Sequence, residues 1–517
     1  MGLVLNKYKN KSTLSLLTGM VKMAMATFSS RILGLVREQT IAHYFGASGL
    51  TDAFLVAYRI PNLLRDMFAE GAFSSAFVPT FISAKLESDK NARELLWTMV
   101  ILLSIITIII GLCIYFFAPQ LISLFAPEFT HNSEKYHHAV NLTKILSPFL
   151  WTISLAALFM GALNAYKIFF LPSFAPAVFN ASTILILYFC YPKKIELLGY
   201  AAMIGAFAQV LIQYPSLHKI SLTPIWPKKF FTDSVKKIFI LLGPGLIGLA
   251  ATQINLLIST ILASSIEGAV SWLNFAFRLF QFPIGILGVS LASSNLVHFA
   301  QSWKSKDVQK QKEGISLLGI GLQTSYELMA PCAVFLIWFA KPIIHLVYQG
   351  GHFSPFDTVQ TSQVLKLYAW GLIFYGPYKI LVPTFYTLGK ERIPVYCAMA
   401  GIFCNILFCT SLTKVYGHEI LALGAGLSIL VNTLGLFIVL KKHLELPMGY
   451  FFGRSQVYLI LALSISILIT KFVKVSSFVL LATNPSKWDC FLEISAFGFI
   501  FFLFYGAILF SLKRFGK

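Results

Sequence analysis

Long apolar segments, separated by short stretches that hold most of the charged residues, dominate the chain. Three of them, Thr98–Phe117, Ile420–Leu440 and Ile494–Leu512, contain no charged residue. A helix needs about 20 apolar residues to cross the hydrocarbon core of a bilayer, so such segments predict membrane spans. The pattern predicts an all-α polytopic membrane protein with about fourteen transmembrane helices. The expected ranges are 14–43, 52–84, 96–120, 138–164, 172–191, 197–216, 235–263, 270–299, 314–340, 358–388, 393–413, 418–440, 454–473 and 490–512.

Composition agrees with this interpretation. Apolar residues make up 57% of the chain and charged residues 12%, and the mean hydropathy is +0.75, an apolar share that a soluble domain could not bury. The net charge of +20 does not indicate nucleic-acid binding, because the basic residues lie in short segments between apolar runs. The cysteines form no CxxC pair, so no zinc site, disulfide framework or cofactor is predicted.

Lysines and arginines are distributed unequally between the two sets of connecting segments. If the N-terminus is inside, the inner segments hold most of them, including Lys85, Lys90, Arg93, Lys441 and Lys442. Such an excess is expected of cytoplasmic loops. An even number of spans then places both termini in the cytoplasm.

A weak internal repeat divides the chain. Leu163–Asn180 and Tyr386–Asn405 each end a span, make a short inner turn with a lysine, and begin a span with a proline. Transporters are often built from such repeats, with the substrate site between them, although chance similarity between apolar sequences is an alternative. We expect an N-terminal lobe over 1–218, a C-terminal lobe over 219–446, and two further helices over 447–517.

Charged residues gather in the first two predicted spans: Arg31, Arg37, Glu38, Asp52, Arg59, Arg65, Asp66 and Glu70. A charge at the centre of a membrane helix costs about 2.5–3.5 kcal/mol, so these side chains are not expected to face lipid. Arg31 and Glu38 lie about two helical turns apart, which places them on one side of the helix. The set therefore predicts a basic, water-accessible site, and internal ion pairing is the alternative for any single member.

Two charged residues stand apart from this cluster. Arg278 has Gln281 one turn later and no acidic residue close to it in the sequence, so we expect it to meet an anionic ligand. A guanidinium group offers a planar fork of donors that matches phosphate oxygens. Glu327, in the ninth span, is expected to be neutral or paired with Lys366 or Lys379, with a proton-coupling role as the alternative.

Four segments carry a family resemblance: SRILGLVRE (Ser30–Glu38), FGASGLTDAFLVAYRIPNLLRDMFAEGAFSSAFVP (Phe45–Pro79), LNAYKIFFLPSFAPAVFN (Leu163–Asn180) and FRLFQFPIGILGVSL (Phe277–Leu291). Together they resemble the MurJ family, also called MviN, of lipid II flippases in the multidrug/oligosaccharidyl-lipid/polysaccharide exporter superfamily. The resemblance spans most of the chain. It is looser at YQGGHFSPFDT (Tyr348–Thr358), and the last two spans match only in number.

The resemblance implies two six-helix lobes around a central cavity, and two C-terminal helices that form a groove for a polyprenyl tail. The implied activity is flipping of lipid II, an undecaprenyl-pyrophosphate-linked disaccharide-peptide, from the cytoplasmic to the periplasmic leaflet of a bacterial inner membrane by alternating access. The implied partners are lipid II, membrane lipids and the cell-wall synthesis machinery. The implied pyrophosphate-binding residues are Arg31, Arg37, Arg65 and Arg278, with Asp52 as a cavity carboxylate, Ala42 as a small residue near the site, and Glu38, Arg59, Glu70 and Gln281 in support.

The sequence also departs from the family. Gln281 stands where some relatives carry an acidic neighbour of the arginine. The second-lobe spans offer Asn255, Asn405 and Asn432 but no central carboxylate, so neither a sodium site nor any other metal site is expected.

Other functions fit less well. A polyprenyl-dependent glycosyltransferase would need a carboxylate or metal-ligand cluster in an outer loop, and His131, His137 and His138 around Glu134 do not have metal-site spacing, so we expect no enzyme. A drug or cation exporter would favour an acidic cavity. The closest alternative is a flippase for another polyprenyl-pyrophosphate-linked saccharide.

Overall fold

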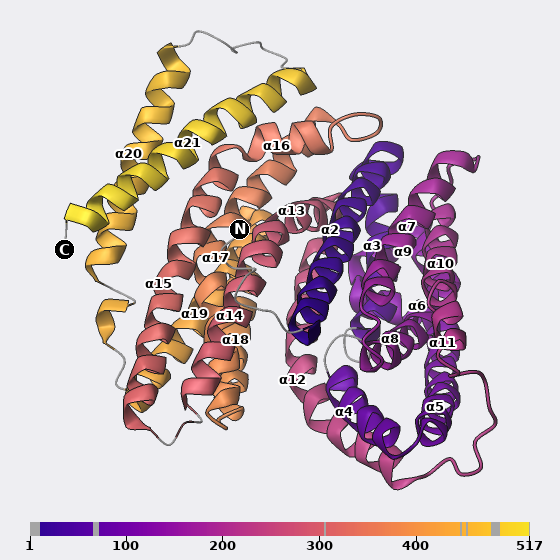
Figure 1. The fold of residues 1–517 in the computed structure, drawn as a ribbon. Coiled ribbons are helices and arrows are strands. Elements are labelled where there is room, and N and C mark those ends of the chain that lie inside the picture. Colours follow the sequence, from indigo (N-terminus) through magenta and orange to yellow (C-terminus); the bar gives the residue numbers. More distant parts are fainter. Residues whose placement is uncertain are drawn as a thin grey trace. The chain divides into compact units, whose positions relative to one another are not determined.

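The protein is helical throughout the part that its structure, a computed structural model, describes: residues 11–65, 72–303, 305, 307–444, 447–450, 453–476 and 486–515. In these ranges a single antiparallel bridge joins Gly350 to Phe353, and no strand forms (Figure 1). Most predicted span ranges fall on one helix, but 52–84, 138–164, 197–216 and 270–299 each run over more than one element. Among the described residues, ten helical stretches are long and apolar enough to cross a membrane. The all-α membrane class is confirmed, and the count of about fourteen spans stays a prediction.

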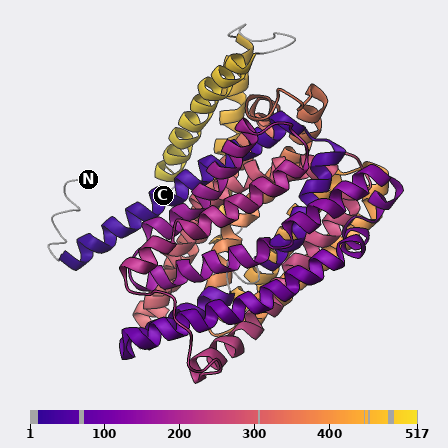
Figure 2. The same cartoon turned by 90° about the vertical axis from the view of Figure 1, so that its right-hand side faces the viewer.

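The chain divides into two compact units, Met1–Glu267 and Gly268–Lys517. The helices of the first unit run alongside one another (Figure 2). They are α2 (Lys11–Phe45), α3 (Gly49–Arg65), α4 (Ala72–Glu87), α5 (Asp89–Phe116), α6 (Ala118–Phe125), η2 (Pro127–His131), α7 (Ser133–Leu146), α8 (Phe149–Ala165), α9 (Phe170–Phe189), α10 (Glu196–Leu211), α11 (Tyr214–Lys219) and α12 (Asp233–Ser264).

The second unit begins with a helix that contains a π-helical segment. Its elements are α13 (Ala269–Pro283), the π segment η3 (Ile284–Gly288), α14 (Val289–Trp303), α15 (Val308–Trp338), α16 (Ala340–Val347), α17 (Pro355–Thr387), α18 (Arg392–Tyr416), α19 (Glu419–Leu444), η4 (Met448–Tyr450), α20 (Arg454–Ser476) and α21 (Lys487–Phe515).

Each unit has its own apolar core. In the first unit, Phe77 of α4, Leu96 of α5, Leu158 of α8 and Ile238 of α12 are fully buried together. Helix α12 therefore packs with the first unit, although the repeat in the sequence assigns it to the second lobe. The predicted lobe boundaries rest on that repeat and stay a prediction.

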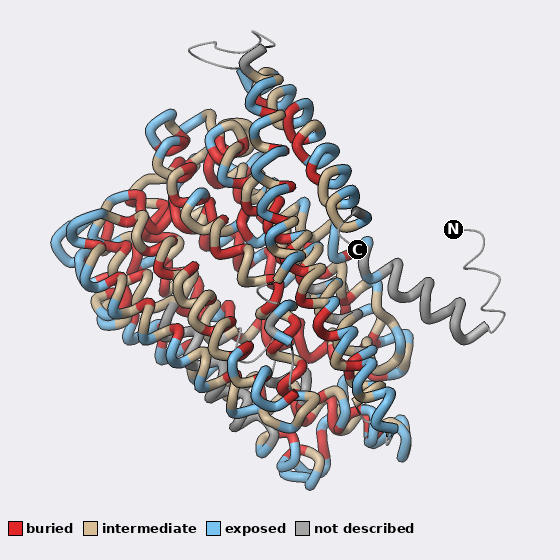
Figure 3. The backbone as a smooth tube through the Cα atoms, turned by 90° about the vertical axis from the view of Figure 1, so that its left-hand side faces the viewer, coloured by how far each residue is buried: buried red, intermediate tan, exposed pale blue. Residues whose placement is uncertain are grey.

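The core of the second unit reaches the C-terminal helices. Leu322 of α15, Leu381 of α17 and Leu436 of α19 are fully buried in one cluster, together with Ala462 of α20 and Tyr505 of α21. Along the helices that face the viewer in Figure 3, buried stretches (red) alternate with exposed ones (pale blue). The last two helices are therefore packed parts of the second unit.

Backbone features recur along the chain at one interval of about 220 residues, as expected of an internal repeat. The matching pairs are the left-handed Gly46 and Gly268, Pro61 and Pro283 inside helices, the N-caps Asn132 and Ser354, the left-handed Lys167 and Gly389, and Pro172 and Pro394 in the first turns of α9 and α18. Turns, caps and helix-interior prolines thus support the repeat that the sequence only suggested.

Candidate functional site

Helix α2 carries four of the predicted site residues, Arg31, Arg37, Glu38 and Ala42, and its contact with α9 fixes its rotation. Asn180 Nδ2 donates a hydrogen bond of 3.1 Å to the carbonyl oxygen of Ser30. A Cβ at Gly34 would lie 3.4 Å from the same nitrogen, so the two helices approach closely there. One turn later the guanidinium carbon of Arg37 lies 5.4 Å from the ring centroid of Phe179. The arginine face of α2 is held in place by these contacts.

Arg37 and Glu38 form an enclosed ion pair. Arg37 Nη2 lies 2.6 Å from Glu38 Oε1, and the two side chains are 12% and 3% exposed. Glu38 thus pairs with its neighbour, whereas its spacing placed it on the side of Arg31. The half-buried Arg31 has no hydrogen bond or ion pair within the described residues. Its guanidinium group is available to a ligand.

Arg65, in the last turn of α3, brings a second cation to Arg37. The two guanidinium groups lie within electrostatic range of each other, as does the hydroxyl of Tyr58. An anion that both groups can bind would offset the repulsion between them. The assignment of both arginines to a pyrophosphate site stays a prediction.

Asp52 is enclosed in this conformation. Its Oδ2 lies 3.4 Å from Lys135 Nζ, with the Asp52 side chain fully buried and that of Lys135 10% exposed. Lys135 Nζ also lies 4.1 Å from the ring centroid of Phe129. A Cβ at Gly49 would lie 2.9 Å from Glu267 Oε1, which leaves little space beside the pair. Asp52 therefore joins α3 to α7.

The supporting residues of the first unit have different surroundings. Arg59 Nη1 donates a hydrogen bond to Thr260 Oγ1, which ties α3 to α12. Ala42 is fully buried near the end of α2. Asp66 and Glu70 lie outside the described residues.

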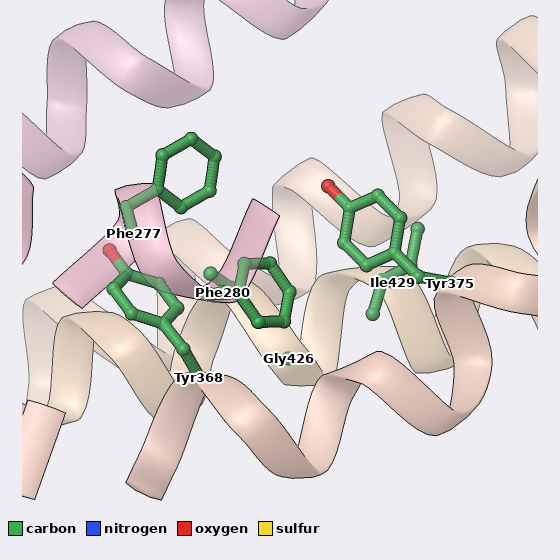
Figure 4. A pocket seen from close by; sticks show the side chains of 7 residues that line it. Phe277, Phe280, Tyr368, Tyr375, Gly426 and Ile429 are labelled. Atoms are coloured by element: carbon green, nitrogen blue, oxygen red, sulfur yellow. The ribbon is translucent and has the colours of Figure 1, made fainter. Parts of the chain in front are cut away.

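Helix α13 presents Arg278 and Gln281 on an exposed face, one turn apart. The adjacent residues Phe277 and Phe280 pack in the opposite direction, with ring centroids 5.6 and 5.5 Å from that of Tyr368 on α17. These rings line a small aromatic pocket together with Tyr375, Ala425, Gly426 and Ile429 (Figure 4). The aromatic face anchors α13 and fixes the direction of its arginine. Arg278 also takes part in an interaction within the protein, so it does not stand alone as its sequence neighbours indicated.

Glu327 corrects a prediction. Its Oε1 lies 2.6 Å from Nζ of Lys513 on α21, whereas Lys366 and Lys379 of α17 were expected as partners. The side chain points to the C-terminal helices because α15 is rotated with Glu327 away from α17. Helical periodicity alone could not indicate this rotation, because both neighbouring surfaces carry lysines.

The histidine-rich segment around Glu134 makes a structural contact. His138 Nδ1 lies 2.7 Å from Glu196 Oε1 and links α7 to α10. Among the described residues, no three histidine, cysteine or acidic side chains could hold a metal ion together.

Sequence reasoning missed three residues of the first unit: Lys135, Asn180 and Thr260. Lys135 lies near the start of a predicted span, where a lysine is typical of an outer loop. Thr260 lies in an apolar helix, where nothing in the sequence indicates a partner. Asn180 did end the repeated segment, and that polar position inside an apolar run was a usable signal.

Comparisons with known proteins agree on one family. The family described as "Lipid II flippase MurJ" matches residues 41–495. A "Probable lipid II flippase MurJ" of Buchnera aphidicola subsp. Schizaphis graminum is 35% identical, with 81% of this chain and 82% of that protein covered. The "Lipid II flippase MurJ" of Burkholderia cenocepacia is 33% identical, with 81% and 82% covered.

Solved structures extend the similarity to the fold. A structure described as "Lipid II flippase MurJ, inward closed conformation" superposes with a TM-score of 0.79 at 26% identity, covering 96% of this chain and 100% of that one. An inward-facing multidrug resistance MATE transporter of the MOP superfamily has a TM-score of 0.66 at 12% identity, covering 82% and 98%, and shares the fold alone.

Proposed function

The chain belongs to the lipid II flippase MurJ family, and from this membership we propose that it moves lipid II from the cytoplasmic to the periplasmic leaflet. It is a multi-pass membrane protein of a bacterial inner-membrane family, and the family activity is transport. Lipid II is the proposed substrate, with membrane lipids and the cell-wall synthesis machinery as further partners. We propose that both termini are cytoplasmic.

One observation supports pyrophosphate as the bound group. Arg37 and Arg65 come from two neighbouring helices and lie within electrostatic range of each other, and Arg31 on α2 has no ion pair within the described part of the chain. Charge-assisted hydrogen bonds from guanidinium forks suit the adjacent phosphates of a polyprenyl pyrophosphate. A drug or cation substrate would be repelled by the same groups.

The transport mechanism that we propose is alternating access by two six-helix repeats. Arg31, Arg37 and Arg65 bind the pyrophosphate from the first repeat and Arg278 from the second, while Asp52, Glu38, Arg59, Glu70, Ala42 and Gln281 shape the site. Binding favours a closed state only through contacts that the open state lacks. The helices of residues 447–517 are proposed to hold the polyprenyl tail. The repeated turns and caps support this division.

Arg31 offers the cleanest test, because substitution there breaks no ion pair within the described residues. Arg31→Ala should fail to support growth of a bacterium depleted of its own lipid II flippase, with near-normal protein abundance. Each lost charge-assisted bond is worth about 1.5–3 kcal/mol, or roughly 10- to 100-fold in affinity. Arg31→Lys should restore part of the function because it keeps the charge but loses the fork.

The unsubstituted chain is the reference in this complementation assay. Growth with normal cell shape would support lipid II as the substrate, and continued lysis would favour another polyprenyl-pyrophosphate-linked saccharide. Full growth of Arg31→Ala would contradict its role in the site.

A further inference from the structure

The C-terminal pair of helices, α20 and α21, contacts α15 at three successive levels. At the first level, Tyr450, just before α20, packs so closely on Gly319 that a Cβ there would lie 2.6 Å from the tyrosine ring. At the third level, Phe335 lies 5.4 Å from Phe502, ring to ring, and packs against Gly498. The second level, between these two, is polar and is formed by Glu327.

Glu327 makes contacts with both helices of the pair. Its carboxylate lies 2.6 Å from Nζ of Lys513 on α21 and accepts a hydrogen bond of 3.1 Å from Ser455 Oγ on α20. Its backbone carbonyl accepts a hydrogen bond of 2.6 Å from the hydroxyl of Tyr505. The Glu327 side chain is 14% exposed and that of Lys513 is 42% exposed. One residue of α15 thus fixes the ends of two helices.

The first unit contains a helix equivalent to α15, and the residue at the position of Glu327 can be compared there. Helices α5 and α15 have matching C-cap residues, Phe117 and Phe339, and the position equivalent to Glu327, counted from these caps, is Ile105. Ile105 is 51% exposed, and Ile109, one turn later, is 55% exposed. At the level of Glu327, α5 therefore exposes an apolar side chain where α15 meets the C-terminal pair.

A carboxylate in an apolar helix is costly unless a partner compensates it. The Glu327 carboxylate has its compensation from the C-terminal pair, and the equivalent helix without such a pair carries isoleucine. The free-energy cost of this carboxylate is therefore tied to the docking of the C-terminal pair, and the core of the repeat does not require it. Lys513 remains partly exposed, so water can reach the contact and weaken it.

We propose that Glu327 is a positioning residue, which fixes the C-terminal pair on α15 through Lys513 so that the pair presents its groove to the polyprenyl tail of the substrate. The proposal rests on the proposed function, which supplies the tail. Glu327 itself does not touch the pyrophosphate. Loss of the ion pair should therefore affect recognition of the tail and leave recognition of the head group intact.

The test is binding of two ligands to the purified full-length protein: lipid II with its undecaprenyl chain, and a synthetic analogue with the same head group on a short prenyl chain. Glu327→Gln and Lys513→Gln should each weaken binding of the long-chain ligand about tenfold and change that of the short-chain analogue less than about twofold. The charge-swapped double variant, Glu327→Lys with Lys513→Glu, should recover most of the long-chain affinity.

Matched controls are available on the same helices. Glu313 on α15 and Arg514 on α21 are exposed, so Glu313→Gln and Arg514→Gln should bind both ligands as the unsubstituted protein does. Equal loss for both chain lengths, no loss at all, or no recovery in the charge-swapped variant would each overturn the positioning role. Failure of the unsubstituted protein to bind either ligand would overturn the proposed function itself.

Discussion

Asp52 and Lys135 bring opposite charges together in an almost dry part of the first unit. Their side chains are 0% and 10% exposed, so neither charge is well solvated. An ion pair in such surroundings adds little net stability, but removal of one partner leaves a buried charge without compensation. The pair therefore constrains which substitutions the contact between α3 and α7 can accept.

Lys135→Met should destabilise the protein by about 3–5 kcal/mol, because it leaves the Asp52 carboxylate buried beside an apolar side chain. The double variant Asp52→Asn with Lys135→Met should recover most of this loss, as followed by thermal melting of the purified protein. Lys236 is the matched control, because its pair with Asp233 is exposed and surface pairs contribute little. A Lys135→Met melting temperature equal to that of Lys236→Met would contradict this account.

The sequence was informative about which residues matter, and less so about their partners. The cost of charge in a membrane predicts that Arg31, Arg37 and Glu38 avoid lipid. The choice of partner depends on helix rotation and on which long side chains can reach each other. Arg37 reaches Glu38, its neighbour in the chain, and Glu327 reaches Lys513 at the far end of the sequence. Neither contact follows from spacing along one helix.

At the scale of elements, short polar motifs set where helices begin and how they pack. The segment Tyr348–Thr358 turns through Gly350 and Gly351 at positive φ and then starts α17 with a capping box between Ser354 and Asp357. Asp357 also accepts a hydrogen bond of 2.9 Å from the indole of Trp272, which fixes α13 on α17. This looser part of the family resemblance therefore has a structural role.

Helices α17 and α19 approach closely at two glycines. A Cβ at Gly371 would lie 2.9 Å from the Cα of Gly426, and a Cβ at Gly426 would lie 2.6 Å from the Trp370 ring. Gly426→Ala should therefore destabilise the protein by about 1–3 kcal/mol through overpacking, measured by thermal melting.

Gly506 on α21 is the matched control for this substitution. A Cβ there meets nothing within 4 Å, so Gly506→Ala should leave the melting temperature unchanged or raise it slightly. Equal melting temperatures for the Gly426 and Gly506 variants would show that the contact between α17 and α19 adjusts without cost.

At the scale of the whole molecule, the sequence predicted the membrane class and most of the helix ranges, because apolar runs are long and charges are rare. It predicted the repeat only weakly, since apolar residues replace one another freely. The structure strengthens the repeat at positions where backbone geometry restricts the choice, such as Gly46 with Gly268 and Pro61 with Pro283. The packing of α12 with the first unit depends on long-range contacts that no local pattern contains.

The distribution of basic residues predicts that both termini and the segment 219–237 lie in the cytoplasm. Fluorescent-protein fusions after Lys517 and within that segment should both fluoresce, and alkaline phosphatase fusions at the same points should be inactive. A phosphatase signal at either point would contradict the even number of spans.

The internal repeat has a consequence for the orientation in which a ligand binds. At the same interval, Arg31 corresponds to Gln253, Arg37 to Ser259, Arg59 to Gln281 and Arg65 to Leu287. If one ancestral six-helix unit was duplicated, the two copies began with identical linings, and divergence has left these four cations in the first copy alone. A ligand with one charged end then has one preferred orientation, so the polarity of the bound molecule is set by the order in which the two copies occur along the chain.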